Sequence, residues 1–159
     1  MKRKVYIETS VVSYLTSRVS RDLVVAARQQ VTGELWPRLL RDYVIVISLP
    51  VLDEVSKGDS EAVGKRLEAI RKIPVLEVDA QVKVLARTLV EARAIPPEYP
   101  EDALHVAVAA INGCDFLLTW NFTHLNNAFT RARIRRVIEQ QGFESPEICS
   151  PDEMFGESP

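Results

Sequence analysis

The chain has 159 residues, of which 47% are hydrophobic and 26% are charged, and its formal net charge is -2. These values are typical of one soluble globular domain with a sizeable core, and they exclude a globally basic nucleic-acid binder while leaving room for a local basic patch. Its two cysteines, Cys114 and Cys149, form no CxxC pair, so neither a zinc finger nor a disulfide framework is indicated and a reducing, cytoplasmic setting is favoured. No apolar run is long enough for a signal-peptide core or a membrane span.

Short apolar runs predict the strands. They lie at residues 5–7, 44–47, 75–78, 116–118 and 147–149, the last as an edge strand. The run at 44–47 is continuously β-branched, as expected when both faces of a sheet are covered.

Helices are predicted between these runs from capping residues and apolar spacing. Thr9 or Ser10 can begin a helix over 11–16, and Asp22 can cap a long one that is kinked or briefly broken near Gly33 and Pro37. A helix carrying Glu54 then ends near residue 58. Later helices are expected over 61–71, with Ser60 as the cap, and over 80–92, with Asp79 as the cap. Two more are expected over 103–111, with Asp102 at its start, and from about 127 to 141, with Asn126 as the cap.

Strands that alternate with helices predict an α/β protein, a three-layer α/β/α fold with a central parallel sheet of four to five strands. We expect one domain over residues 1–150 and a C-terminal tail over 151–159, with no second domain. In such sheets ligands bind outside the carboxyl ends of the strands.

Four acidic or amide residues follow this rule. Glu8 ends the first predicted strand, Glu54 is on the helix after the second, and Asn121 follows the fourth. Asp102 opens the helix that leads into the fourth strand. Carboxylates that converge repel one another unless a cation or a proton joins them, and oxygen ligands suit a hard ion. The pattern therefore predicts a Mg²⁺ or Mn²⁺ site that can activate water near a phosphodiester.

Each of these residues also has a purely structural explanation. Acids at helix N-termini are common, which explains Glu8 or Asp102, while Glu54 fits an exposed helix face and Asn121 fits a turn. His105, one turn beyond Asp102, is better explained as a hydrogen-bonded core histidine or a partner of Asp102 than as a catalytic base. The joint placement carries the metal-site hypothesis.

Positive charge is concentrated in residues 131–136, where Arg131 and Arg135 share one helix face. Such a stripe can hold phosphates or be a solvated helix face, and the two readings are about equally supported. Arg18, Arg21 and Lys57 flank the predicted site and are better placed to meet a polyanion there.

These motifs resemble those of the PIN-domain family, and within it the VapC-type toxins of prokaryotic toxin–antitoxin pairs. The resemblance covers residues 5–149: Glu8-Thr9-Ser10 stands where the family has Asp and a small hydroxyl residue, and Glu54 matches the Glu after the second strand. The segment 102–107, Asp-Ala-Leu-His-Val-Ala, matches closely, and the segment 119–122, Thr-Trp-Asn-Phe, stands where the family usually has Thr-x-Asp.

The resemblance implies a Mg²⁺- or Mn²⁺-dependent endoribonuclease, often dimeric, that a small antitoxin protein holds inactive. Glu8, Glu54 and Asp102 would be catalytic and hold the metal, with Asn121 as a further ligand or helper. The residues expected to support them are Thr9, Ser10, His105 and Thr119. Glu8 in place of Asp is one methylene longer, and Asn121 in place of Asp removes a charge, so one ion is favoured over two.

Two other functions compete with the ribonuclease. The departures at Glu8 and Asn121 leave open a PIN-fold binding module with weak or no nuclease activity. Another α/β protein of phosphate chemistry is less well supported, because a receiver-like domain needs Asp after the first strand and no GxxxxGK or GxGxxG motif occurs.

Overall fold

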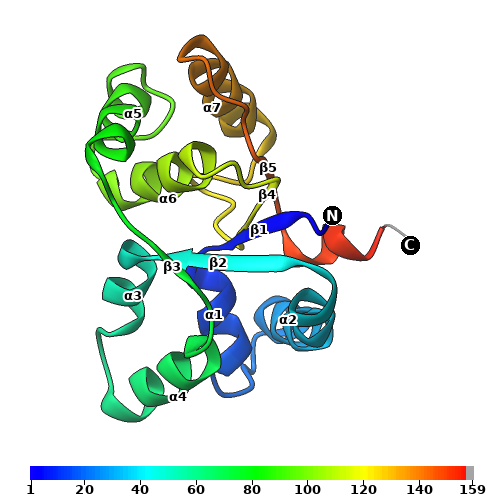
Figure 1. Ribbon diagram of the computed structural model, residues 1–159. Helices are drawn as coiled ribbons and strands as arrows, with labels where there is room; N and C mark the ends of the chain where they lie inside the picture. Colours follow the sequence, from blue (N-terminus) through cyan, green and yellow to red (C-terminus); the bar gives the residue numbers. More distant parts are fainter. Residues whose placement is uncertain (157–159) are drawn as a thin grey trace.

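The centre of the molecule is a five-stranded, fully parallel sheet (Figure 1). The computed structural model describes residues 1–156. The strands run in the order β3-β2-β1-β4-β5, with the bounds β1 (Lys4–Ile7), β2 (Val44–Ser48), β3 (Val75–Leu76), β4 (Phe116–Leu118) and β5 (Glu147–Cys149). β3 is shorter than the predicted 75–78, since it pairs only with β2 at the sheet edge and the chain turns away to begin the next helix at Asp79. The predicted parallel sheet is confirmed.

Helices cover both faces of the sheet (Figure 1). On one side lie α1 (Thr9–Thr16), α2 (Leu23–Asp42) and α4 (Ser60–Ile70), and on the other lie α5 (Ala80–Glu91), α6 (Pro100–Ile111) and α7 (Ala128–Gln140). The short α3 (Leu49–Val55) contacts α1, α4 and α6. The predicted three-layer α/β/α fold is therefore confirmed.

Capping residues begin most of these helices. Asp22 and Asp79 accept hydrogen bonds from backbone amides three residues on, as predicted. At α4 and α7 the cap is one residue away from the predicted one: Asp59 caps α4 instead of Ser60, and Asn127 caps α7 instead of Asn126. In both cases two capping-type residues are adjacent, so sequence alone does not choose between them.

The long helix α2 is continuous, so of the two possibilities predicted near Gly33 and Pro37, a kink or a brief break, the break was wrong. A proline inside a helix lacks an amide hydrogen, and its ring crowds the carbonyl four residues earlier, which here belongs to Gly33. Leu35 and Leu39 of the same stretch are almost completely buried in the core. Their packing offsets the lost hydrogen bond, since tertiary burial stabilises helices more than local propensity does.

The C-terminal segment continues past the sheet. A 3-10 helix, η1 (Pro151–Phe155), follows β5, contacts α2 and buries Met154. This segment belongs to the tail predicted over 151–159, of which residues 157–159 lie outside the described part of the chain. Within residues 1–156, no helix is both long and apolar enough to cross a membrane.

The chain order places a ligand site next to β1. From β1 the chain proceeds to β2 and β3 on one side, then returns to form β4 and β5 on the other. Such a reversal of direction leaves a crevice at the carboxyl ends of the two strands that flank it, here β1 and β4. Glu8 follows β1 directly and Thr119 follows β4 directly.

Candidate functional site at the carboxyl end of the sheet

Glu8 is held firmly at the end of β1. Its carboxylate Oε1 accepts hydrogen bonds at 2.5 Å from the hydroxyls of both Ser10 and Thr119, and Oε2 accepts one at 3.2 Å from the Ser10 amide. Glu8 is thereby the cap of α1, a role predicted for Thr9 or Ser10. The side chain is only 5% exposed. Its extra methylene is accommodated by this network of hydroxyl donors.

Glu54 lies at the end of a buried hydrogen-bond chain. Its Oε1 accepts from the Thr9 hydroxyl at 2.9 Å and lies 2.5 Å from Nε2 of His105. On the other side of the imidazole, Nδ1 lies 2.6 Å from the Tyr6 hydroxyl, which lies 2.6 Å from the Ser48 hydroxyl. His105 is completely buried. The chain of contacts fixes the carboxylate of Glu54 on the short helix α3.

Asp102 occupies the first turn of α6, where Pro100 begins the helix. The start of α6 folds back to the site: Asp102 Oδ2 lies 3.0 Å from Nδ1 of His124, and Oδ1 accepts a weak hydrogen bond from the Asn121 amide at 3.4 Å. The Asn121 carbonyl oxygen in turn accepts from the His124 backbone amide at 3.0 Å. Asn121 therefore uses both ends of its side chain inside the protein.

Electrostatic effects show that the three carboxylates share one neighbourhood. Burial alone would lower the pKa of His105, but the hydrogen bond to Glu54 and the charges of Glu8, Glu54 and Asp102 raise it above its ordinary value. Burial raises the pKa of Asp102, and the charge of Glu8 adds to this. Burial acts on Glu54 in the same direction, yet the hydrogen bond and charge of His105 hold the pKa of Glu54 below its usual range.

The donor set suits a hard divalent cation. Three carboxylates come from three separate segments of the chain, and both hydrogen bonds that Glu54 receives end on Oε1, so Oε2 can serve another ligand. No three His, Cys, Asp or Glu side chains within residues 1–156 form a ready-made metal-binding group. Carboxylate oxygens are the ligands that Mg²⁺ and Mn²⁺ usually take in proteins.

Three residues at this site were not singled out from the sequence. Tyr6 read as a strand residue, Ser48 lay just after the strand predicted over 44–47, and His124 read as a loop residue without a role. Tyr6 is fully buried, and burial raises the pKa of its hydroxyl well above the ordinary value. A usable signal exists for Tyr6 and Ser48: both are polar residues inside otherwise apolar strands, which need a partner when buried. No comparable pattern marks His124.

Two of the four arginines in the basic segment of α7 are paired. Arg131 donates to Asn126 at 2.5 Å, and Arg135 pairs with Glu147 at 2.6 Å. The shared face of Arg131 and Arg135 is therefore occupied by structural contacts. Lys57 lies close enough for its charge to lower the pKa of Glu54, whereas Arg18 makes a long, exposed pair with Glu61 at 3.9 Å.

Comparison with known families supports the fold. The model of the PIN domain matches residues 5–132, which is most of the chain and includes Glu8, Glu54, Asp102 and Asn121. The family resemblance predicted from the sequence is thereby confirmed. No curated protein sequence matches the chain.

Solved structures with the same fold cover nearly all of the chain. A chain of VapBC2 from Rickettsia felis, solved with a DNA fragment from their promoter, is 16% identical with a TM-score of 0.58 and covers 92% of this chain and 98% of its own. VapBC-1 from nontypeable Haemophilus influenzae gives 14% identity, a TM-score of 0.59, and coverage of 94% and 98%. VapC20 from Mycobacterium tuberculosis, a toxin that cleaves the sarcin–ricin loop, gives 20% identity, a TM-score of 0.55, and coverage of 80% and 94%.

Proposed function

The chain belongs to the PIN domain family, and from that premise we propose that it is a metal-dependent endoribonuclease, the toxin of a type II toxin–antitoxin pair. The observation that carries the proposal is the direct contact of Glu54 with the buried His105, at a site where Glu8 and Asp102 are close enough for their charges to act on the same imidazole. The VapC and VapBC proteins that share the fold support the toxin assignment.

In the proposed mechanism Glu8, Glu54 and Asp102 would hold Mg²⁺ or Mn²⁺. An ion held there would lower the pKa of a bound water and would neutralise charge on the scissile phosphodiester. His105 keeps Glu54 ionised and fixed in place through the 2.5 Å contact. Thr119 and Ser10 orient Glu8, and Thr9 orients Glu54. The carboxylates are thus presented in one geometry before substrate arrives, which is how preorganised polar groups accelerate reactions.

Asn121 serves this site as a positioning residue. Its amide donates to Asp102 and its carbonyl oxygen accepts from the His124 backbone, so both ends already have protein partners. Because the Asn121 side chain is neutral, it adds no negative charge to that of Glu8, which already acts on Asp102. We therefore expect three carboxylates and one ion, with Asn121 holding Asp102 or a bound water.

The decisive experiment compares two adjacent acids on α3. Glu54→Gln keeps the size of the side chain but removes the charge and weakens the contact with His105, so RNA cleavage with Mn²⁺ should fall by at least about a hundredfold. Asp53→Asn changes the exposed neighbour and should leave cleavage near the wild-type rate. Equal rates for wild type and Glu54→Gln would overturn the metal-site assignment.

The partners we propose are an RNA substrate, a small antitoxin protein and a second copy of the chain in a homodimer, all in the cytoplasm. Expression of the chain alone should arrest growth, and co-expression of a short reading frame adjacent to its gene should restore growth. The same arrest by Glu54→Gln would show that toxicity does not depend on the proposed site. Light scattering on the purified protein tests the dimer.

A PIN-fold binding module with weak or no nuclease activity is the second candidate. It is favoured by the internal hydrogen bonds that occupy both oxygens of Glu8 and by the lack of a ready-made metal group in the described part of the chain. Calorimetry with Mg²⁺ and Mn²⁺ separates the two. Millimolar or tighter binding that Glu54→Ala abolishes would count against a module without metal chemistry.

A further inference from the structure

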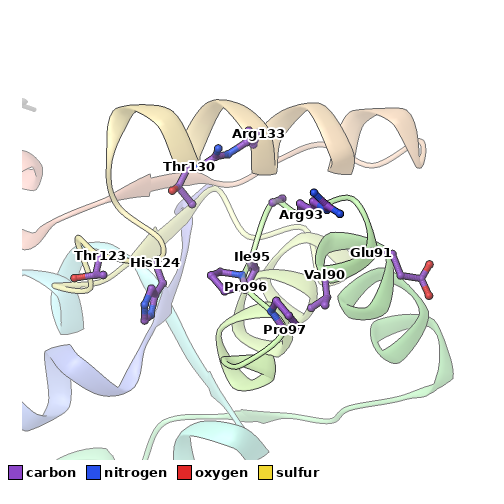
Figure 2. Close-up of a pocket in the computed structure, with 11 residues that line it drawn as sticks. Val90, Glu91, Arg93, Ile95, Pro96, Pro97, Thr123, His124, Thr130 and Arg133 are labelled. Carbon is purple, nitrogen blue, oxygen red and sulfur yellow. The ribbon is translucent and has the colours of Figure 1, made fainter.

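A pocket of about 570 Å³ opens beside the carboxylate site. Figure 2 shows Thr130 and Arg133 of α7 on one side and Arg93, Ile95 and Pro97 of the α5–α6 connection on the facing side, with His124 at one end. The residues come from three separate parts of the chain. The size falls within the range usual for small-ligand sites.

Two arginines give this pocket a positive charge that the fold does not use. Neither the Arg93 side chain nor the Arg133 side chain makes a hydrogen bond or ion pair within residues 1–156, whereas the side chains of Arg131 and Arg135 of the same helix α7 are both paired. The one acid in the lining, Glu91, points away from the two guanidinium groups in Figure 2. Two unpaired guanidinium groups facing one cavity suit an anion with several oxygens, since the planar fork matches phosphate.

His124 connects the pocket to the carboxylates. It lines the pocket and its Nδ1 lies 3.0 Å from Oδ2 of Asp102. The ring of Tyr99 packs against the imidazole at a centroid distance of 3.8 Å, which holds it in this position. A ligand in the pocket therefore lies one side chain away from a proposed metal ligand.

Apolar residues form one part of the remaining wall. Ile95 is fully buried at the base, and Pro96 and Pro97 present rigid, exposed rings on one side. A flat base or a ribose can pack on such a surface while its phosphate meets the arginines, and stacking of this kind is tolerant of sequence. An acidic protein segment would satisfy the arginines but would make less use of the proline wall.

We propose that this pocket binds one nucleotide of the RNA substrate next to the scissile phosphodiester, with the nucleotide's phosphate between Arg93 and Arg133 and its base or sugar on Pro96 and Pro97. The inference rests on the proposed ribonuclease function, because it assigns a place for RNA beside the same carboxylates. It adds a substrate-binding role for two arginines that lie outside the metal site.

Binding of a short single-stranded RNA, measured by fluorescence anisotropy with Ca²⁺ in place of Mg²⁺, tests the proposal without relying on cleavage. Arg93→Gly and Arg133→Ala should each weaken binding about tenfold, as expected for loss of one charge-assisted contact. Each should also reduce the slope of log K against log salt by about 0.7, the value for one phosphate contact on a single strand. The controls are Arg87→Ala and Arg136→Ala, exposed arginines of α5 and α7 outside the pocket.

The outcomes separate this inference from the proposed function. If the pocket variants bind RNA as tightly as the controls, with an unchanged salt slope, the pocket proposal is overturned even if the protein cleaves RNA. If the pocket variants lose RNA binding while the wild type cleaves no RNA with any metal, the pocket stands and the nuclease proposal fails. Loss of antitoxin binding with RNA binding intact would assign the arginines to a protein partner and overturn the proposal.

Discussion

The Nε2 atom of His105 lies 2.5 Å from Oε1 of Glu54, although the two residues are 51 positions apart in the chain. His105 belongs to α6 on one face of the sheet, and Glu54 belongs to the short α3. The contact joins the two helices at the site and continues inward through Tyr6 to Ser48. Buried polar groups are costly when unpaired. This chain of hydrogen bonds therefore both stabilises the fold and holds the carboxylate of Glu54 in place.

Removal of the Tyr6 hydroxyl tests the structural part of that chain. Tyr6→Phe keeps the buried ring but leaves Nδ1 of His105 and the Ser48 hydroxyl without this partner, so the free energy of unfolding should fall by about 1–3 kcal/mol. Urea denaturation measures the change. Tyr43→Phe, at a half-buried tyrosine, should stay within about 0.5 kcal/mol of wild type. An equal fall in unfolding free energy in both variants would contradict the proposed contribution of the Tyr6 hydroxyl to stability.

The pair also predicts how the stability of the metal-free protein depends on pH. The pKa of His105 is raised above 6.5, so its contribution is complete below pH 6.5 and is lost as pH rises through the folded-state pKa. The pKa of Glu54 is lowered below 4.5, so its contribution is present above pH 4.5 and is lost as pH falls through the folded-state pKa. The pair therefore stabilises most between pH 4.5 and 6.5.

Denaturation in EDTA over a pH series checks this window. The difference in unfolding free energy between wild type and His105→Gln should be largest inside the window and should shrink on both sides. Subtracting the variant removes the contributions of titrating groups that His105 does not act on; Asp102 is not one of them, because its charge and that of His105 act on each other. A difference that is constant with pH would show that the pair does not titrate as described.

Protons should compete with the metal at Asp102. Burial and the charge of Glu8 raise the pKa of this carboxyl above its ordinary value of 3.8, and only the ionised form binds a cation well. The affinity for Mg²⁺ should therefore weaken as pH falls towards the raised pKa. Calorimetry from neutral to mildly acidic pH measures this, and Asp102→Asn should bind weakly at every pH. Equal affinity throughout for the wild type would contradict the prediction.

Sequence reasoning reached the sheet and the acids because both obey simple rules. Continuous β-branched runs predict buried parallel strands, and the carboxyl ends of such strands meet at one edge, which places Glu8 and Asn121 together. The match of residues 102–107 to the family pattern supplied Asp102 where spacing alone was weak. The continuity of α2 through Pro37 was missed because core packing outweighs local propensity there.

The contacts of the histidines were beyond the reach of the sequence. His105 was expected to be a buried, hydrogen-bonded residue, and the structure buries it completely, but its partner is Glu54 of another helix as well as Tyr6 of β1. His124 acquires its neighbour Asp102 only when the loop after β4 folds against the start of α6. Neither contact follows from periodicity, since both join segments that pack through tertiary structure.

An aspartate at position 121, as in the family pattern that the sequence resembles, should strengthen metal binding and lower the unfolding free energy of the metal-free protein. Asn121→Asp removes the amide that donates to Asp102 and places a like charge beside it, so unfolding free energy without metal should fall by about 1 kcal/mol or more. Added Mg²⁺ or Mn²⁺ should recover that stability, because a ligand that binds only the folded state stabilises it. Gln81→Glu, on the exposed first turn of α5, controls for added charge.

Arg93 carries a backbone strain that can be separated from its side chain. It follows α5 with φ of 59°, the left-handed region in which glycine is usual after a helix and other residues cost about 1 kcal/mol. Arg93→Gly should therefore be more stable than Arg93→Ala by about 1 kcal/mol, as measured by urea denaturation. Both lack the guanidinium group and should bind RNA equally weakly.

If Arg93→Gly is the more stable of the two and both bind RNA equally weakly, RNA affinity at this position depends on the guanidinium group and not on local stability. If instead RNA affinity follows stability, with Arg93→Gly retaining wild-type binding and Arg93→Ala losing it, the effect belongs to the backbone of the α5–α6 connection and the guanidinium contact is ruled out.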